Sequence, residues 1–237
     1  MAAMTLDELV SQLRAAYGTE LRAVVLYGSA AAGEHIPKRS DFNVLVVVDS
    51  LGLERLRAAA AVARAWGEGG NHPPLTMTTS EWRGSADIFP MEYADILERH
   101  KILYGELPTE GLQVAPRDLR LQLEQEAMGK LLKLRQGVLA AGGDERRLTE
   151  LLAASLSTIM VIFRAVVRLH GARPAMDNLA VSRAVAEYAG FDAAPFERVV
   201  RHVRGEQAVT TAEVGPVLAG YLRGMEKAVA HLDRFAP

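Results

Sequence analysis

The chain has 237 residues, of which 49% are hydrophobic and 24% charged, and its formal net charge is −2. This length suits two modest domains, and the composition is that of a soluble globular protein. Sequence-independent binding of nucleic acid needs a strong basic excess, so this balance argues against nucleic acid as the main partner. Without any cysteine, the chain has no disulfide and no thiolate metal site.

Neither a signal peptide nor a membrane span is expected from the sequence. The first residues lack the basic and apolar runs of a signal peptide. The longest uncharged apolar stretch, Leu151 to Phe163, is shorter than the roughly 20 residues that cross a membrane. We therefore predict a buried helix there, no membrane partner and a cytoplasmic protein.

The first hundred residues alternate between helical and strand-like patterns. A strand-like run from Leu21 stops at Gly28, and the β-branched run from Phe42 to Val48 is typical of a strand buried on both faces. Helices are predicted over Leu6–Tyr17, Leu51–Trp66 and Met91–Lys101, and strands over Leu21–Tyr27, Phe42–Val48 and Pro74–Thr79, before a closing segment Ile102–Gly105.

The character of the chain changes between Gly105 and Arg117, a stretch that contains two prolines and a second glycine. We place the domain boundary there, with domains at 1–110 and 116–237. The second half shows only helical patterns, and Asp118 is predicted to cap its first helix. Its helices are predicted over Asp118–Ala140, Asp144–His170, Asn178–Tyr188, Pro195–Arg204 and Thr211–Phe235. The predicted class is α+β: a small mixed sheet with flanking helices, then an antiparallel helical bundle.

One motif in the first half carries chemistry. Gly28 and Ser29 stand where a strand gives way to an expected helix of small residues, Ala30 to Gly33. Backbone N–H groups at the start of a helix attract phosphate, and glycine lets the phosphate approach closely. Asp41 begins the next strand after eleven intervening residues, and a carboxylate there could hold Mg²⁺ beside a triphosphate. Lys38 and Arg39 could steer phosphates, or could belong to a solvated loop.

This pattern resembles the nucleotidyltransferase superfamily, which includes DNA polymerase β and the aminoglycoside nucleotidyltransferases. The resemblance is carried by Tyr27-Gly28-Ser29 and by Ser40-Asp41-Phe42-Asn43-Val44, and it covers about residues 1 to 105. It implies Gly28, Ser29 and Arg39 as nucleotide-binding residues, Asp41 as the catalytic residue, and Asp41 with Asn43 as Mg²⁺ ligands. The helical half is similar to the bundle of kanamycin-type nucleotidyltransferases and, more loosely, to HEPN bundles.

The sequence departs from the family at the metal ligands. The second carboxylate position holds Asn43, whose amide oxygen brings no charge. The predicted strand that should carry the third carboxylate offers only Thr76 or Thr78, and Glu92 stands in a segment that looks helical. Losing two anionic ligands should cost several kcal/mol, a rate loss on the order of a thousandfold or more.

Three functions remain open at this point. The first is a protein that binds a nucleoside triphosphate with weakly held Mg²⁺ and transfers poorly or not at all, a pseudoenzyme. The second is an active Mg²⁺-dependent enzyme that moves a nucleoside monophosphate to an unidentified hydroxyl acceptor. The third is a non-catalytic interaction module of toxin–antitoxin type. A carboxylate brought near Asp41 by the fold would favour the second.

The helical half contains a further pair of interest. Arg164 and His170 are separated by five residues, which fits the spacing of HEPN ribonucleases, although Ala165 replaces the usual polar residue after the arginine. A histidine before Gly171 can instead be a simple helix-end residue.

Overall fold

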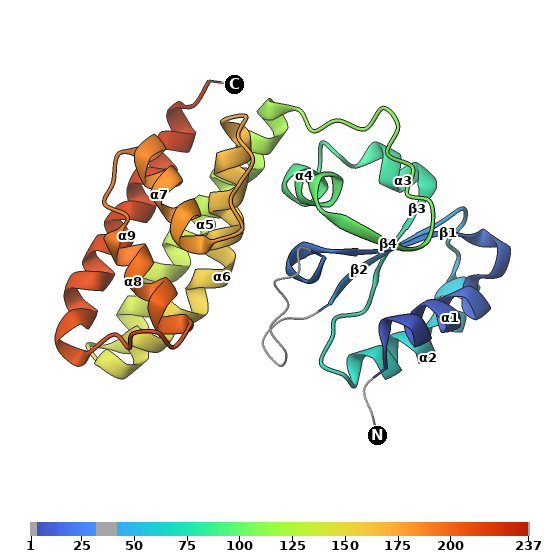
Figure 1. Ribbon diagram of the computed structural model, residues 1–237, viewed down its shortest axis with the longest axis horizontal. Coiled ribbons are helices and arrows are strands. Elements are labelled where there is room, and N and C mark those ends of the chain that lie inside the picture. The colour runs from blue at the N-terminus through green and yellow to red at the C-terminus, as the bar shows by residue number, and fades with distance from the viewer. Residues whose placement is uncertain (1–3, 32–41, 237) are drawn as a thin grey trace. The chain divides into compact units, whose positions relative to one another are not determined.

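The computed structural model describes residues 4–31 and 42–236. The chain divides into two compact units, Met1–Val114 (unit 1) and Ala115–Pro237 (unit 2). Unit 1 contains a sheet with helices, and the described residues of unit 2 form helices joined by short loops (Figure 1). The predicted α+β class, a mixed sheet followed by a helical region, is confirmed.

Four strands of unit 1 form one mixed sheet among the described residues. They are β1 (Leu21–Tyr27), β2 (Asn43–Val48), β3 (Leu75–Thr78) and β4 (His100–Gly105), in the spatial order β3-β2-β1-β4. Strand β1 pairs antiparallel with β2 and with β4, whereas β2 and β3 are parallel. The central strands are almost entirely buried, as their continuous apolar sequence predicts.

Helices cover both faces of this sheet (Figure 1). Successive side chains of a strand point to opposite faces, so Val46 packs toward α1 and α2, whereas Leu45 and Val47 pack toward α3 and α4. We call these the α2 face and the α4 face. The helical elements of unit 1 are α1 (Leu6–Tyr17), η1 (Gly18–Glu20), η2 (Gly28–Ala30), α2 (Leu53–Gly67), α3 (Thr79–Gly84) and α4 (Pro90–Glu98).

Two details of unit 1 differ from the sequence-based expectation. The helix expected to run to Lys101 ends at Glu98, because His100 and Lys101 pair with β1 instead and begin β4. The short helix α3 was not expected. It begins directly after β3 because Thr78 and Glu81 form a capping box, in which the Thr78 hydroxyl accepts from the Glu81 N–H and the Glu81 carboxylate accepts from the Thr78 N–H.

Unit 2 is built from helices that pack along one another (Figure 1). The first helix begins two residues before the expected cap: Ala115 is its N-cap and Asp118 lies within the first turn. The correction follows from Pro116, whose fixed φ and missing N–H suit the first helical position. The helices are α5 (Pro116–Ala141), α6 (Glu145–Leu169), α7 (Asn178–Ala189), α8 (Ala194–Val203) and α9 (Thr211–Arg234).

The central helix of unit 2 is α6. It packs against α5, α7, α8 and α9, and its buried side chains include Leu152, Ile159 and Phe163. Among the described residues it is the one helix whose length and apolar composition would suffice to cross a membrane, but half of that apolar window is buried inside the protein. The stretch from Leu151 to Phe163 is therefore part of a core helix, as predicted.

Candidate functional site

The turn after β1 is shaped by a glycine in the left-handed region of backbone space. Gly28 has φ +74° and begins η2, a 3₁₀ helix of one turn that also contains Ser29. A Cβ atom built on Gly28 would lie 3.0 Å from the Nδ2 atom of Asn43. A side chain at position 28 would therefore be strained and would crowd Asn43, so glycine keeps the backbone here open to a close approach.

Asn43 lies on the α4 face of the sheet. It is paired with Tyr27 across the antiparallel ladder, and it has the same alternation as Leu45 and Val47, which pack on that face. The residue before it, Phe42, packs on the α2 face, 6.0 Å between ring centroids from Trp66. The start of β2 thus directs an amide, rather than an apolar group, toward α4.

The structure describes only part of the predicted site. Gly28 and Asn43 lie close together, and Ser29 lies in the same turn as Gly28, while the roles of these residues in binding nucleotide or metal remain predictions from sequence. Asp41 and Arg39 lie outside the described residues, so their roles as metal ligand and nucleotide-binding residue remain predictions from sequence.

Helix α4 brings two carboxylates to this end of the sheet. Glu92 and Asp95 lie one turn apart, and each precedes a residue, Tyr93 or Ile96, that packs into the core of the α4 face. Burial raises the pKa of the Tyr27 hydroxyl, and the nearby charges of Glu92 and then Asp95 raise it further. The charges of both acids therefore act on the hydroxyl of the residue that precedes Gly28.

Asp95 is held by an ion pair within the helix. The Arg99 Nη2 atom donates to its Oδ1 at 2.8 Å, and the two side chains are only 12% and 24% exposed. His100 is fixed in the same region, because its Nδ1 lies 2.7 Å from the Ile96 carbonyl, which can only accept. Asp95 and Arg99 were not singled out from the sequence. The available signal was the three-residue spacing between Glu92 and Asp95, which places them on one side of a helix.

The threonines of β3 lie on the wrong face to replace a metal-binding carboxylate. Thr76 and Thr78 are in register with Val46 and Val48, which pack on the α2 face. Thr76 donates to the Pro74 carbonyl at 3.3 Å, and Thr78 caps α3. The expectation that β3 offers its ligand position at one of these residues is therefore wrong, since it is Leu75 and Met77 that share the side of Asn43.

The oxygen donors on the α4 face suit a hard cation. An amide oxygen from Asn43 and carboxylates from Glu92 and Asp95 are the ligand types that Mg²⁺ accepts, usually together with waters and phosphate oxygens. Within the described residues, no three His, Cys, Asp or Glu side chains converge as a ready-made metal site.

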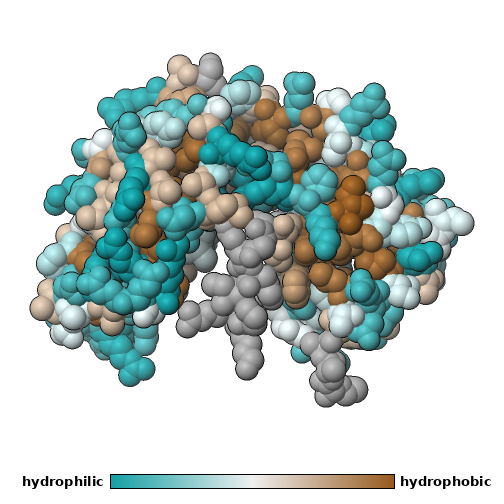
Figure 2. All heavy atoms as spheres, in the orientation of Figure 1, coloured by the Kyte–Doolittle hydropathy of each residue, from teal (hydrophilic) through white to brown (hydrophobic). Residues whose placement is uncertain are grey.

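Apolar side chains also reach the surface of unit 1, where they appear as brown patches in Figure 2. Ile88 and Phe89, which immediately precede α4, are 61% and 46% exposed. Exposed apolar residues beside polar ligands are a common feature of small-molecule sites.

The ribonuclease-like pair of unit 2 is engaged in structural contacts. The Arg164 guanidinium donates to the Met176 carbonyl at 3.2 Å and to the side chain of Asn178 at 2.7 Å. His170 stacks on Tyr188 and lies 2.9 Å, Nε2 to Nε2, from His231. These contacts tie α6 to the loop before α7 and to the end of α9, so both residues have a packing role.

Comparison with known proteins identifies a solved structure with a similar fold. No family model matches the sequence, and no curated protein matches it. Among solved structures, the chain is similar to spectinomycin adenyltransferase AAD(9) from Enterococcus faecialis, whose structure contains ATP and spectinomycin. The TM-score is 0.56 at 14% identity, over 92% of this chain and 96% of that one. The chain therefore has the fold of a nucleotidyltransferase across both units.

Proposed function

We propose that this protein binds a nucleoside triphosphate at the end of β1, together with Mg²⁺, and that it transfers nucleotide weakly or not at all. The observation that carries the proposal is the approach of Gly28 to Asn43, in a fold shared with an adenyltransferase whose structure contains ATP. A glycine with positive φ leaves the backbone N–H groups of the turn open to phosphate oxygens. Ser29 would add a hydroxyl donor, as the sequence predicts.

Weak transfer is expected because of the amide at position 43. Bound Mg²⁺ would neutralise charge on the triphosphate, and an anionic ligand holds such an ion more tightly than an amide does. Asp41 is the anionic ligand expected from the sequence, and Asn43 stands where the family has a second one. Asn43 can orient the ion or a phosphate, but its uncharged amide cannot neutralise positive charge on the metal.

A second candidate is active transfer to a hydroxyl acceptor, and Glu92 and Asp95 favour it. In that reaction the acceptor oxygen bonds to the α-phosphorus, the bond to the pyrophosphate breaks, and the hydroxyl proton passes to a base. A carboxylate from α4 could accept that proton. Ile88 and Phe89 would then offer apolar contacts to an acceptor near α4.

Calorimetric titration of the whole chain with ATP and other nucleoside triphosphates, with and without Mg²⁺, tests the proposal. Binding without turnover supports it, whereas pyrophosphate release with an added hydroxyl acceptor supports the active enzyme. If the folded protein binds no triphosphate at all, the proposal is wrong and the interaction module becomes the better reading.

The turn is tested by Gly28→Val, which should weaken triphosphate binding by about tenfold or more, because the added side chain crowds Asn43 and blocks the phosphate. The matched control is Gly70→Val. Gly70 also has positive φ, at +86°, but nothing lies within 4 Å of a Cβ built there. Both variants carry backbone strain, and only the first should lose affinity. Equal binding by both folded variants would place the nucleotide elsewhere.

A further inference from the structure

Helix α5 of unit 2 has large apolar side chains on two sides. Its buried side, which includes Leu123 and Leu131, belongs to the core of unit 2, where α5 packs against α6 and α9. On another side of the same helix, four large apolar side chains are exposed: Leu121, Met128, Leu132 and Leu139. A helix that packs on one face ordinarily has a polar opposite face, so this second apolar side indicates a contact with another surface.

The four exposed side chains form one line along α5, which we call the α5 stripe. They follow one another at intervals of seven, four and seven residues. At 3.6 residues per turn, these intervals keep all four within about 20° of one direction over about 27 Å. Among the described residues of unit 2, the other large apolar side chains with such exposure are Val161 and Met176. Most of the exposed apolar residues of this unit are thus aligned rather than scattered.

The α5 stripe is symmetric about its own midpoint. Leu121 and Leu139 are each nine residues from position 130, and Met128 and Leu132 are each two residues from it. When a second copy of α5 is laid on the stripe in the antiparallel direction, Leu121 meets Leu139 and Met128 meets Leu132, and each contact occurs twice. A two-fold axis relates the two copies, and such a self-complementary face is what the interface of a symmetric dimer requires.

The charges beside the α5 stripe favour the same arrangement. Glu124 and Arg135 lie on one flank of the stripe, six residues before and five residues after its midpoint. In an antiparallel helix pair each flank meets the same flank of the other copy, so Glu124 comes level with Arg135 of the second copy. In a parallel pair opposite flanks meet, and these charges would lie beside Gln125 and Gln136 instead. The pattern of charges therefore selects an antiparallel second copy as the partner.

Both charged side chains already belong to ion pairs that a second copy would extend. Glu124 pairs with Arg120 at 3.1 Å, and Arg135 pairs with Glu226 of α9 at 2.8 Å. The side chains of Glu124 and Arg135 are nevertheless 31% and 49% exposed, so each can accept or donate a further contact without breaking its own pair. Exposed ion pairs contribute little affinity, but they set the orientation of an interface.

From the α5 stripe and its flanks we propose that this protein forms a homodimer in which the α5 helices of two copies pack antiparallel across a two-fold axis. The apolar side chains supply the affinity, and the Glu124–Arg135 contacts set the direction. One pair of helices is a small interface, so the dissociation constant should be on the order of micromolar.

Sedimentation equilibrium of the whole chain, whose monomer mass is 25.7 kDa, measures the association. Leu132→Glu places a carboxylate against Met128 of the other copy, twice in each dimer, and should raise the dissociation constant about a hundredfold or more. The matched control is Leu56→Glu. Leu56 of α2 is 47% exposed, against 49% for Leu132, and lies outside the stripe, so this change should alter the dissociation constant by less than about threefold. Circular dichroism confirms that each variant is folded.

The direction of the helix pair is measured by crosslinking, since the chain has no cysteine of its own. Two single variants, Leu121→Cys and Leu139→Cys, are treated with a short bis-maleimide, first separately and then after mixing. Antiparallel packing predicts a crosslinked dimer in the mixture and little in either variant alone, because equal positions at the stripe ends lie about 27 Å apart along the pair.

Three results would overturn the inference. The first is a wild-type chain that stays monomeric at a concentration about a hundredfold above the micromolar range. The second is a dimer that Leu132→Glu leaves intact, or that Leu56→Glu weakens equally, since the contact would then lie on another surface or reflect general charge. The third is a dimer that crosslinks in each single variant but not in the mixture, which would indicate parallel helices. All three are independent of whether unit 1 binds a nucleotide.

Discussion

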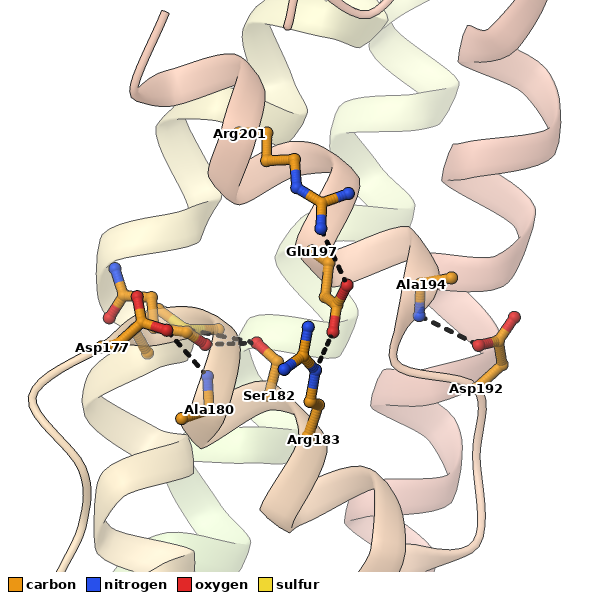
Figure 3. A network of polar contacts seen from close by, with 10 residues as sticks. Asp177, Ala180, Ser182, Arg183, Asp192, Ala194, Glu197 and Arg201 are labelled. Atoms are coloured by element: carbon orange, nitrogen blue, oxygen red, sulfur yellow. Dashed lines mark hydrogen bonds and ion pairs between the residues drawn. The ribbon is translucent and has the colours of Figure 1, made fainter. Parts of the chain in front are cut away.

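The two units of this protein use charged side chains in different ways. In unit 2, charges join helices to one another: Glu197 of α8 accepts from Arg183 of α7 and from Arg201 one turn further along α8 (Figure 3). Arg198 of α8 donates to Glu213 in the first turn of α9, and this pairing, with the Thr210 cap, lowers the pKa of Glu213 to about 2. In unit 1, by contrast, Asp95 pairs with Arg99 at the end of the same helix, and Arg22 of β1 pairs with Asp49, which follows β2.

The two units also differ in what lies next to their closely packed glycines. A Cβ on Gly224 of α9 would collide with the ring of Phe196, so that glycine lets an aromatic core close. Phe196 stacks on Tyr221 and packs against Phe163 and Phe191. At Gly28 the atoms nearest to such a Cβ belong instead to the polar side chain of Asn43. In unit 2, the missing side chain of Gly224 lets aromatic rings pack closely. In our proposal, the missing side chain of Gly28 lets a ligand approach the backbone in unit 1.

The largest effect that would sharpen this comparison is expected from Phe196→Ala. Its side chain is fully buried, so its loss should destabilise unit 2 by about 3–5 kcal/mol. Circular dichroism at 222 nm reports mainly the helices, whereas both tryptophans, Trp66 and Trp82, lie in unit 1 and report it by fluorescence. Leu139→Ala is the control, because Leu139 is 82% exposed and should change stability little. A similar loss in both variants would contradict the assigned core.

An intermediate effect is expected from Asn43→Asp in unit 1. The new carboxylate keeps the size of the side chain and lies on the α4 face, so Mn²⁺ affinity in the presence of a non-hydrolysable triphosphate should rise by about tenfold. Thr76→Asp adds the same charge on the α2 face and should leave the affinity unchanged. Tighter binding by Thr76→Asp, or none by Asn43→Asp, would show that the face of the strand does not decide metal binding.

The smallest effect concerns the histidine pair of unit 2. Burial lowers the pKa of His170 and of His231, and the neighbouring positive charge of His231 or Arg234 lowers each further. An imidazole whose folded pKa is depressed contributes stability that is present above the unfolded value, about 6.5, and is lost as the pH falls below it. Protonating both rings also breaks their shared hydrogen bond.

We therefore expect the free energy of unfolding of unit 2 to decline between pH 7 and pH 5, and to decline less steeply in His231→Gln. Glutamine keeps a hydrogen-bonding group near His170 and removes one titrating ring. Urea unfolding followed by circular dichroism measures the slope. His72→Gln, an exposed histidine of unit 1, should leave it unchanged. An unaltered slope in His231→Gln would mean that the pair does not titrate in this range.

Much of the fold followed from local patterns. The predicted helix Leu6–Tyr17 matches α1 exactly in its bounds, and the β-branched run after Phe42 is β2, because periodicity and capping act over a few residues. The errors occurred where a distant segment competes. His100 and Lys101 could continue a helix by their own propensity, but the open edge of β1 offers them backbone partners.

For the candidate site, the sequence by itself determined that a glycine turn precedes a strand with an uncharged Asn43, because that information lies in the order of residues. Only the tertiary structure decided which face of the sheet that amide and the residues of the neighbouring strands occupy. The face of Thr76 depends on the register of β3 against β2, and the position of Glu92 depends on how α4 packs across the sheet. Register and packing are set by contacts between segments far apart in sequence, and a one-residue shift in register reverses the face of every side chain in a strand.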